Sequence, residues 1–478
     1  MTDFLDPPAL LHDLTVDEFN GGRATAGGVS VRDFPFPYRA GFAISNDCDS
    51  FGRAAFEDWH AVLNGSGTIG GRDGLNLEIG DSYWGWIGHV VPDGMGLHDH
   101  YPDDEPRKDS ANLARIVELG QAGWLDTMHS LGNWRLGPGG APVDMARDQV
   151  VYLLDRLDSL GLYPNVLVNH SASPSNVGGP WGWYQGADDP EHPLYCLDLL
   201  KSFGFRFHWL DVFTIFDGFG SDLQLESRRE VRQRLHQFNW GPWLRRRKPE
   251  GGIAPVVLGA NDAEIRQNLI GFLNRTLMHV EGRDGTPILA FKRQRGWDQP
   301  VMDGFPVQVT EADLDMLERR RGAAIIYQHF GLSAARGRWP SPHAPKRTAT
   351  APPVLDEHAY DRFRELSDRH RNGRILVATT GRLLQYLHLR DRLDFGIDRS
   401  DERWVLHVHG IDCPVSGHRK VEAAEINGLS FCVPADAPEI AVEIAGASRE
   451  FPFRRQADPD SPDRTVLFLP WSQLEWPN

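Results

Sequence analysis

The chain has 478 residues, of which 41% are hydrophobic and 24% charged, and this ordinary globular composition excludes a disordered chain. Its 50 Lys and Arg against 66 Asp and Glu give a net charge of −16, which argues against nucleic acid or an anionic membrane as a partner. No apolar run approaches the ~20 residues that cross a bilayer, and the N-terminus has no signal-peptide pattern, so we expect a cytoplasmic protein.

Short apolar runs alternate with amphipathic stretches over most of the chain. The runs that predict β-strands are residues 41–45, 75–80, 124–130, 165–170, 205–210, 287–293, 323–329 and 374–380. Between several of them, apolar residues recur at helical spacing, as they do in residues 146–162 and 358–373. Strands that alternate with helices indicate a parallel α/β sheet, and seven or eight of them predict a closed or nearly closed (β/α)7–8 barrel.

The pattern changes after about residue 399. Short strand-like runs divided by Pro, Gly and Asp follow one another without a helical pattern between them, at residues 403–411, 429–435, 439–446 and 464–471. Such a series predicts a small all-β sandwich. We therefore expect a barrel domain with an N-terminal extension over residues 1–399 and a β-sandwich domain over residues 400–478.

Several of the predicted strands end in an acidic residue or a histidine. The residues concerned are Asp47, Asp49, Asp126, His129, His170 and His329. Asp47 and Asp49 lie two apart at the end of an apolar run, so their carboxylates point to the same side of the strand. In a parallel α/β barrel the reactive residues lie at the carboxyl ends of the strands, where the loops open. We therefore expect these side chains to meet in one site.

The chemistry of this set favours a metal-dependent hydrolase. The four cysteines are scattered and form no C-x-x-C pair, so the candidate ligands are carboxylates and imidazoles, which suit Zn²⁺ or another divalent first-row metal. A metal held in this way lowers the pKa of a bound water to ~7 and makes hydroxide available for attack on a carbonyl carbon. A carboxylate that does not bind the metal would act as general base, and a histidine on the other side of the substrate as general acid.

The motifs at these strand ends resemble those of the polysaccharide deacetylase family, the NodB-homology carbohydrate esterases, over residues 39–390. In "ISNDCDS", the resemblance makes Asp47 the catalytic base and Asp49 a metal ligand. In "HSLGN" it makes His129 a metal ligand, and in "IIYQH" it makes His329 the catalytic acid. The family's fold is a (β/α) barrel, and the implied activity is the metal-dependent removal of an acetyl group from a sugar or a polysaccharide precursor.

Two positions depart from the family's motifs. Cys48 separates Asp47 from Asp49, whereas the two acidic residues of the family's motif are adjacent. Asn133 stands where the family has the second metal-binding histidine. His170 also ends a predicted strand, and we expect it to replace the missing imidazole.

A carbohydrate is the partner that the remaining candidate residues favour. The predicted substrate-binding residues are Asp126, Asn133, Trp181, Trp183, Arg293 and Trp297. Tryptophans in loops can stack their rings on pyranose rings, which is why Trp181 and Trp183 belong to this set. Arg293 and Trp297 are a loose match to the family's motif that carries an arginine and an aromatic residue.

Two alternatives to a deacetylase remain open at this point. A glycoside hydrolase on a similar barrel would pair Asp47 or Asp49 with a distant carboxylate, such as Asp126 or Asp211, at a separation of ~5 to 10 Å and without a metal. A non-catalytic carbohydrate-binding relative would keep the barrel and lose the metal, as the replacement at Asn133 suggests.

Overall fold

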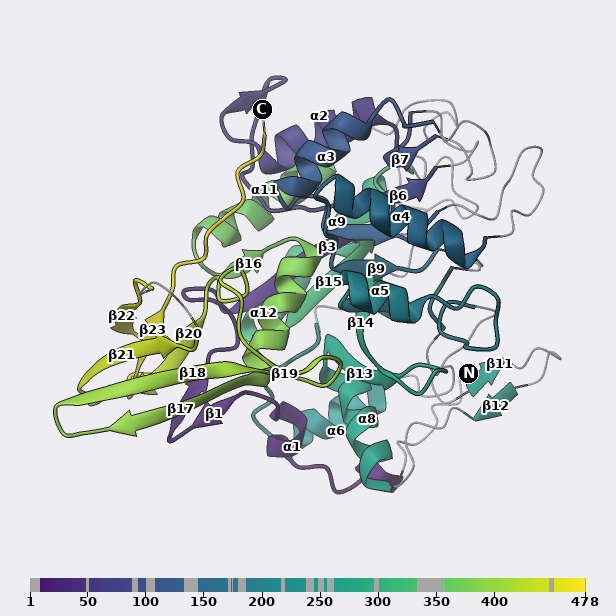
Figure 1. Cartoon of the computed structure of the whole chain (residues 1–478). Helices are drawn as coiled ribbons and strands as arrows, with labels where there is room; N and C mark the ends of the chain where they lie inside the picture. The colour runs from purple at the N-terminus through teal and green to yellow at the C-terminus, as the bar shows by residue number, and fades with distance from the viewer. Residues whose placement is uncertain are drawn as a thin grey trace.

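The computed structural model of the chain is a mixed α/β structure in which a curled parallel sheet adjoins two antiparallel sheets (Figure 1). The residues that it describes are 9–48, 51–87, 93–99, 108–132, 145–170, 173, 175–178, 186–215, 220–237, 245–247, 253–255, 262–295, 301–332, 355, 357–446 and 451–477. The expected α/β class is thereby confirmed.

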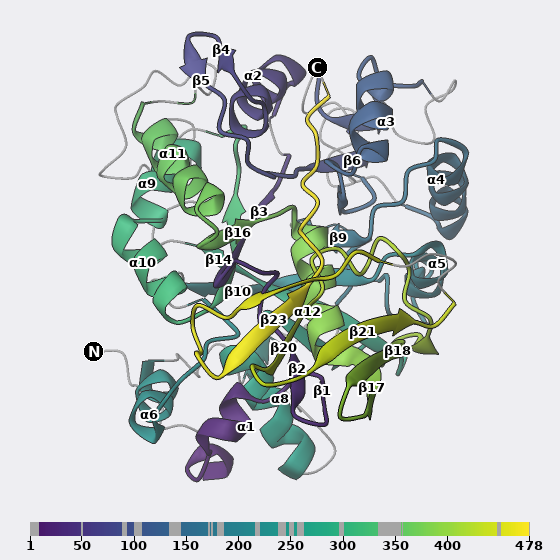
Figure 2. The ribbon, with the colours of Figure 1, turned by 90° about the vertical axis from the view of Figure 1, so that its left-hand side faces the viewer.

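Ten of the described strands form the main sheet. Along the sheet the order is β16 (Ile375–Val377), β3 (Ala40–Asn46), β15 (Ala323–Gln328), β14 (Pro287–Arg295), β10 (Phe207–Ile215), β9 (Val166–Val168), β8 (Thr127–His129), β6 (Ser82–Trp86) and β7 (Gly96–His98). Each of these strands is parallel to its neighbours, whereas β13 (Leu277–Glu281) pairs with β14 in the antiparallel direction. The sheet curls into a half-barrel (Figure 2). Because its strands are parallel, their carboxyl ends lie along one edge of it.

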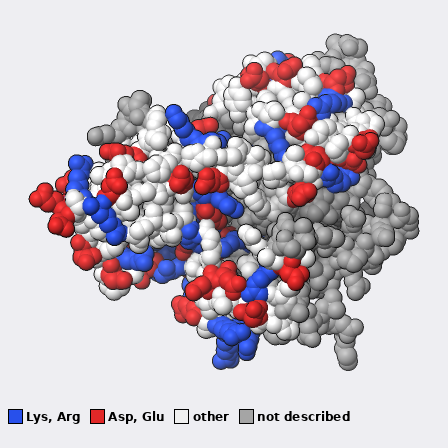
Figure 3. Space-filling view, turned by 60° about the horizontal axis from the view of Figure 1, so that its bottom comes forward, with Lys and Arg blue, Asp and Glu red and all other residues white. Residues whose placement is uncertain are grey.

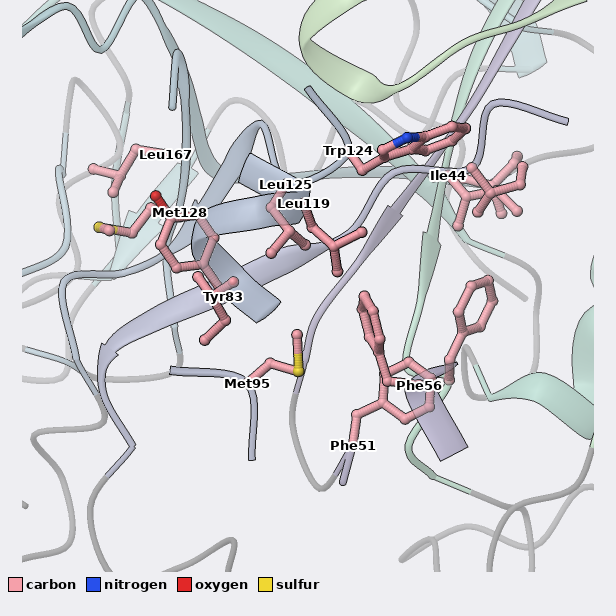
Figure 4. Close-up of a cluster of buried hydrophobic side chains, with 14 of the residues drawn as sticks. Ile44, Phe51, Phe56, Tyr83, Met95, Leu119, Trp124, Leu125, Met128 and Leu167 are labelled. Atoms are coloured by element: carbon pink, nitrogen blue, oxygen red, sulfur yellow. The ribbon is translucent and has the colours of Figure 1, made fainter. Parts of the chain in front are cut away.

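Helices cover the outer face of this half-barrel (Figure 2). They are α2 (Arg53–Asn64), α3 (Leu113–Gln121), α4 (Arg147–Ser159), α5 (Leu197–Phe203), α9 (Phe305–Gln308), α10 (Glu311–Arg319) and α11 (Glu357–Arg371). Figure 4 shows part of the core between helices and sheet, where Ile44 of β3, Phe56 of α2 and Leu119 of α3 point toward one another. A separate small core joins α1 (Val16–Asn20), α6 (Arg228–Gln237) and α8 (Asp262–Asn274).

The concave face of the sheet is filled in its lower part by α12 (Thr380–Arg392). Val166, Phe207 and Leu289 are aligned across β9, β10 and β14 and belong to the same apolar core as Leu383 and Leu387 of the helix. Buried residues occur all round α12, which is typical of a helix enclosed by a core rather than lying on a surface.

Two smaller sheets follow α12 in the chain, and their described pairs are antiparallel except that β21 runs parallel to β18. One contains β17 (Leu393–Arg399), β18 (Arg403–Cys413), β19 (Gly417–Arg419) and β21 (Glu439–Ile444). The other has the order β1 (Thr25–Ala26), β2 (Val29–Val31), β20 (Ser430–Pro434), β23 (Arg464–Phe468) and β22 (Arg454–Ala457). The strands predicted after residue 399 are therefore present, and the second sheet also takes in two strands from the N-terminal extension.

The predicted strand over residues 75–80 is wrong. The stretch is buried except for Asn76, whose φ of 49° interrupts an extended backbone, and it forms no strand because the groups that satisfy its backbone come from α2. The N–H groups of Leu75 and Leu77 donate to carbonyls in the last turn of α2. The side chain of Asn64 bonds both the N–H and the C=O of Ile79, each at 2.9 Å. An apolar run alone cannot distinguish such a segment from a strand.

Residues 469–477 form an extended C-terminal strap, which runs from the antiparallel sheets to α2 and α3 (Figures 1 and 2). Glu78 anchors it, since its buried carboxylate accepts the indole N–H of Trp471 at 2.8 Å and the N–H of Leu474 at 3.0 Å. Further along, the ring of Trp476 stacks on His60 with centroids 5.6 Å apart. The strap thus connects the C-terminal part of the chain to the outer helices.

Charged side chains of both signs are intermixed on the face shown in Figure 3, without a large region of one sign. Among the helices that the structure describes, none has the length and apolar character needed to span a bilayer.

We predict that Leu387→Ala lowers the free energy of unfolding by about 2–5 kcal/mol, because Leu387 is fully buried between α12 and the sheet and its truncation leaves a cavity. The matched control is Val151→Ala on α4, where the side chain is 41% exposed and the expected change is below about 0.5 kcal/mol. Urea unfolding followed by circular dichroism measures both. Equal losses in the two variants would contradict the role given to α12.

Candidate functional site

Five of the residues predicted from the sequence lie together at the carboxyl edge of the half-barrel. They are Asp47, His129, His170, Arg293 and His329. They come from β14, from the end of β8 and from the residues that follow β3, β9 and β15. The structure thus brings these five side chains together at one edge of the sheet.

The alternation of side chains along a strand places this group on the concave face. The register aligns one row of residues across β8, β9, β10 and β14, namely His129, Val168, Trp209 and Phe291. His170 and Arg293 each follow a member of this row by two residues, so they point to the same side, one step closer to the carboxyl edge. The polar side chains of the site therefore lie closer to the carboxyl edge of the sheet than the apolar side chains that pack on α12.

Asp47 and Arg293 form a forked ion pair at the centre of the group. Nη2 of Arg293 donates to Oδ2 of Asp47 at 3.2 Å, and Nη1 donates to Oδ1. The guanidinium is fully buried and lies between two aromatic rings, with Cζ 3.5 Å from the ring centre of Trp209 and 4.0 Å from that of Tyr327. A delocalised, weakly hydrated guanidinium is suited to such a stack, so both its orientation and its charge are fixed.

This arrangement decides the charge of Asp47. Burial alone would raise the pKa of the carboxyl group, but the positive charge of Arg293, with smaller contributions from His129 and His329, holds that pKa below its usual value. Asp47 is therefore an ionised carboxylate near neutral pH.

Two imidazoles, His129 and His170, lie on one side of the carboxylate. Nδ1 of His129 is 3.4 Å from Oδ1 of Asp47, and Nε2 of the same ring is 2.9 Å from Nδ1 of His170. The indole of Trp84 meets both rings edge to face, with centroids 4.3 and 4.8 Å away. A carboxylate that faces Nδ1 of a histidine favours the tautomer whose Nε2 lone pair is available to a metal or a proton.

The two facing nitrogens offer part of a metal site. The facing ring nitrogens of His129 and His170 are 2.9 Å apart, and imidazole nitrogens are ligands that Zn²⁺ accepts, so these two residues could hold such an ion together. Within the described part of the chain there is no group of three or more His, Cys, Asp or Glu side chains that could hold a metal. Asp49, the third ligand predicted from the sequence, lies outside that part.

His329 lies on the other side of the carboxylate and is 14% exposed. Its Nε2 is 3.7 Å from Oδ2 of Asp47 and 3.1 Å from the hydroxyl of Tyr327. The carboxylate is thus flanked by one imidazole facing His170 and another beside the hydroxyl of Tyr327. Carboxylates and imidazoles are both groups that can accept or donate a proton.

Asp126, predicted to bind substrate, lies at the amino end of β8, whereas His129 lies at its carboxyl end. Oδ2 of Asp126 accepts the N–H of Gly381 at 2.7 Å, and Oδ1 accepts the hydroxyl of Thr127 at 2.9 Å. Burial raises the pKa of this carboxyl group. Its observed contacts therefore hold the start of α12 against the sheet.

The other predicted site residues lie outside the described residues. They are Asp49, Asn133, Trp181, Trp183 and Trp297, and the side chain of Asp211 is likewise not described.

Trp84, Trp209 and Tyr327 belong to the site but were missed by the sequence analysis. The structure places Trp84 in β6. Trp209 and Tyr327 lie two residues after buried apolar residues of their strands, Phe207 and Ile325, and this two-residue spacing was the available signal.

The chain was compared with protein-family models, curated proteins and solved structures, and none of them matches it.

We predict that Arg293→Met lowers the free energy of unfolding at pH 7 by about 3–5 kcal/mol, because it leaves a buried carboxylate without its partner. In the native protein the lowered pKa of Asp47 stabilises the fold above the ordinary carboxyl pKa, and this contribution disappears as the pH falls through the folded value. In the variant, burial raises that pKa, so the difference between the two proteins shrinks at acidic pH.

Urea unfolding between pH 3 and pH 8 measures this difference. The control is Arg403→Met, an exposed arginine at the start of β18, for which a change below about 0.5 kcal/mol is expected at every pH. A loss for Arg293→Met that does not depend on pH would contradict the proposed charge of Asp47.

Proposed function

We propose that the chain is a metal-dependent hydrolase that removes an acyl group, such as acetyl, from a sugar or a polysaccharide precursor. The observation that carries the proposal is the ionised carboxylate of Asp47, which is held by Arg293 and flanked by His129 and His329. The resemblance of the strand-end motifs to polysaccharide deacetylases supports the same reaction. A barrel of the polysaccharide deacetylase type and a C-terminal β-sandwich are the finer fold that this proposal implies.

In the proposed reaction each described residue has one role. Asp47 accepts a proton from the attacking water, and its charge and direction are maintained by Arg293. His329 lies across the carboxylate from His129 and donates a proton to the departing amine or alkoxide. The tyrosine hydroxyl 3.1 Å from Nε2 of His329 orients the ring.

His129 and His170 are the described residues that would hold the metal, with Asp49 as the third ligand that the resemblance implies. Such a metal supplies a water of lowered pKa and polarises the carbonyl oxygen. In this proposal His170 replaces the second metal-binding histidine of the family, at whose position this chain has Asn133, because His170 contacts His129 directly. Zn²⁺ fits an imidazole and carboxylate donor set.

We predict that Asp47→Asn lowers kcat for acetate release by about 10²–10⁴-fold, which is the usual contribution of a general base. The assay measures acetate released from tetra-N-acetylchitotetraose and 4-nitrophenol released from 4-nitrophenyl acetate. The control is Asp398→Asn on β17, where the carboxylate is 84% exposed, and it should keep full activity. Unchanged rates with Asp47→Asn would remove Asp47 from the reaction.

We also predict about one equivalent of divalent metal in the protein after incubation with Zn²⁺ and removal of excess, measured by elemental analysis. His129→Ala and His170→Ala should each lose the metal. The control is His208→Gln, at a buried histidine of β10 that is not one of the proposed ligands, and it should keep the metal. Loss in His129→Ala alone would exclude His170 as a ligand. Failure of the wild type to retain any metal would overturn the metal-dependent reaction in favour of a glycoside hydrolase or a carbohydrate-binding protein.

A further inference from the structure

A network of buried polar side chains adjoins the end of β3 that leads to Asp47. The amide of Asn46 donates to Oδ1 of Asp81 at 2.8 Å, and Nε2 of His60 donates to Oδ2 of Asp81 at 2.8 Å. Nδ1 of His60 accepts the amide N–H of Asn64 at 3.1 Å. The exposed fraction of each of these residues is 3% or less. We refer to Asn46, Asp81 and His60 as the Asn46–Asp81–His60 network.

This network reaches the segment that carries His329. The side-chain carbonyl of Asn46 accepts the N–H of Phe330 at 2.7 Å. On the other side of the histidine, the carbonyl of Gln328 accepts the N–H of Asp47 at 2.8 Å. His329 is therefore bracketed by two hydrogen bonds, and both of them lead to β3 or to the residue that directly follows it.

Ser82, which directly follows Asp81 of the network, fixes the backbone on both sides of Asp47. The hydroxyl of Ser82 donates to the carbonyl of Asn46 at 2.8 Å and accepts the N–H of Cys48 at 3.2 Å. Asp81 accepts the N–H of Ser82 at 2.7 Å. Displacement of Asp81 would therefore loosen the chain immediately before and after Asp47.

The C-terminal strap covers the outer end of the network. Trp476 stacks on the imidazole of His60 with an interplanar angle of 16°, and the guanidinium of Arg115 lies over the ring of Trp476 with Cζ 5.5 Å from the centroid. A buried carboxylate such as that of Asp81 is tolerated only while all its donors remain in place, because water is not available to replace them.

We propose that Asn46, Asp81 and His60 are positioning residues, which hold the base Asp47 and the acid His329 at the separation required for the proposed hydrolysis. The separation in question is the 3.7 Å between Oδ2 of Asp47 and Nε2 of His329. The catalytic consequence rests on the proposed function, whereas the geometry that the network fixes is a property of the folded chain alone.

The first test compares Asn46→Ala with Asn274→Ala. Asn274 is an equally buried amide, but its side chain bonds Phe19 and Leu223 instead of the network. We expect Asn46→Ala to lower kcat for acetate release about 100-fold with KM within about twofold of the wild-type value, because a misplaced catalytic pair weakens the transition state more than substrate binding. Asn274→Ala should keep its kcat.

A second variant exchanges the two groups of the central hydrogen bond, as Asn46→Asp combined with Asp81→Asn. The aspartate at position 46 still accepts the N–H of Phe330, and the new amide at position 81 donates to it, so the bond between the two positions is restored in reverse, although the N–H of Ser82 loses its acceptor at position 81. We therefore expect each single substitution to lower kcat and the exchange to recover about tenfold of that loss and no more. A double variant with a kcat below that of both single variants would mean that the two positions do not act through this bond.

Crystal structures of the wild type and Asn46→Ala provide a measurement that does not need activity. We expect the separation between Asp47 and His329 to change by about 1 Å or more in the variant. An unchanged separation, or an equal loss of kcat in Asn274→Ala, would overturn the positioning role. If the wild type releases no acetate, the proposed hydrolysis fails, and the crystallographic comparison still decides the role of the network.

Discussion

The buried ion pair between Asp47 and Arg293 is the constraint on which the rest of the site depends. Each charge taken out of water costs several kcal/mol unless a partner and hydrogen bonds compensate for it. Both partners here are almost completely buried. Asp47 directly follows β3 and Arg293 lies in β14, and these two strands are separated in the sheet by β15 alone. The pair can form only when the three strands end at matching levels. The ion pair that sets the charge of Asp47 therefore depends on the register of the sheet.

The concave face of the half-barrel divides into two levels as a result. Its lower level is apolar and packs on α12, so it contributes stability and no chemistry. Its upper level begins with the row of His129 and Trp209, where the strands end and polar groups gather. Segments distant in the sequence pack around this half-barrel, because β1 and β2 join the sheet of β20 and the C-terminal strap brings Trp476 onto His60 of α2.

Much of this edge could be predicted from the sequence, since apolar runs that end in Asp or His identify the strands and their carboxyl ends together. Asp47, His129, His170 and His329 were found in this way, and Arg293 by a looser match. The aromatic stack on Arg293 could not be predicted, because it depends on which strands are neighbours in space. The false strand at residues 75–80 has a similar cause, because only the fold brings Asn64 to its backbone. The contact of Trp476 with His60 joins positions too distant in sequence for any local pattern to reveal.

The charge of Asp47 also bears on what the proposed reaction requires. A carboxylate whose pKa is held low by a cation is a weak base, and general bases are most effective when their pKa is near the working pH. Such a group cannot readily deprotonate ordinary water, so the attacking water must itself be made more acidic. A divalent metal does this, and the facing nitrogens of His129 and His170 lie beside the same carboxylate. In the proposed reaction, the ion pair that keeps Asp47 ionised therefore calls for a more acidic water, which a metal held by His129 and His170 would supply.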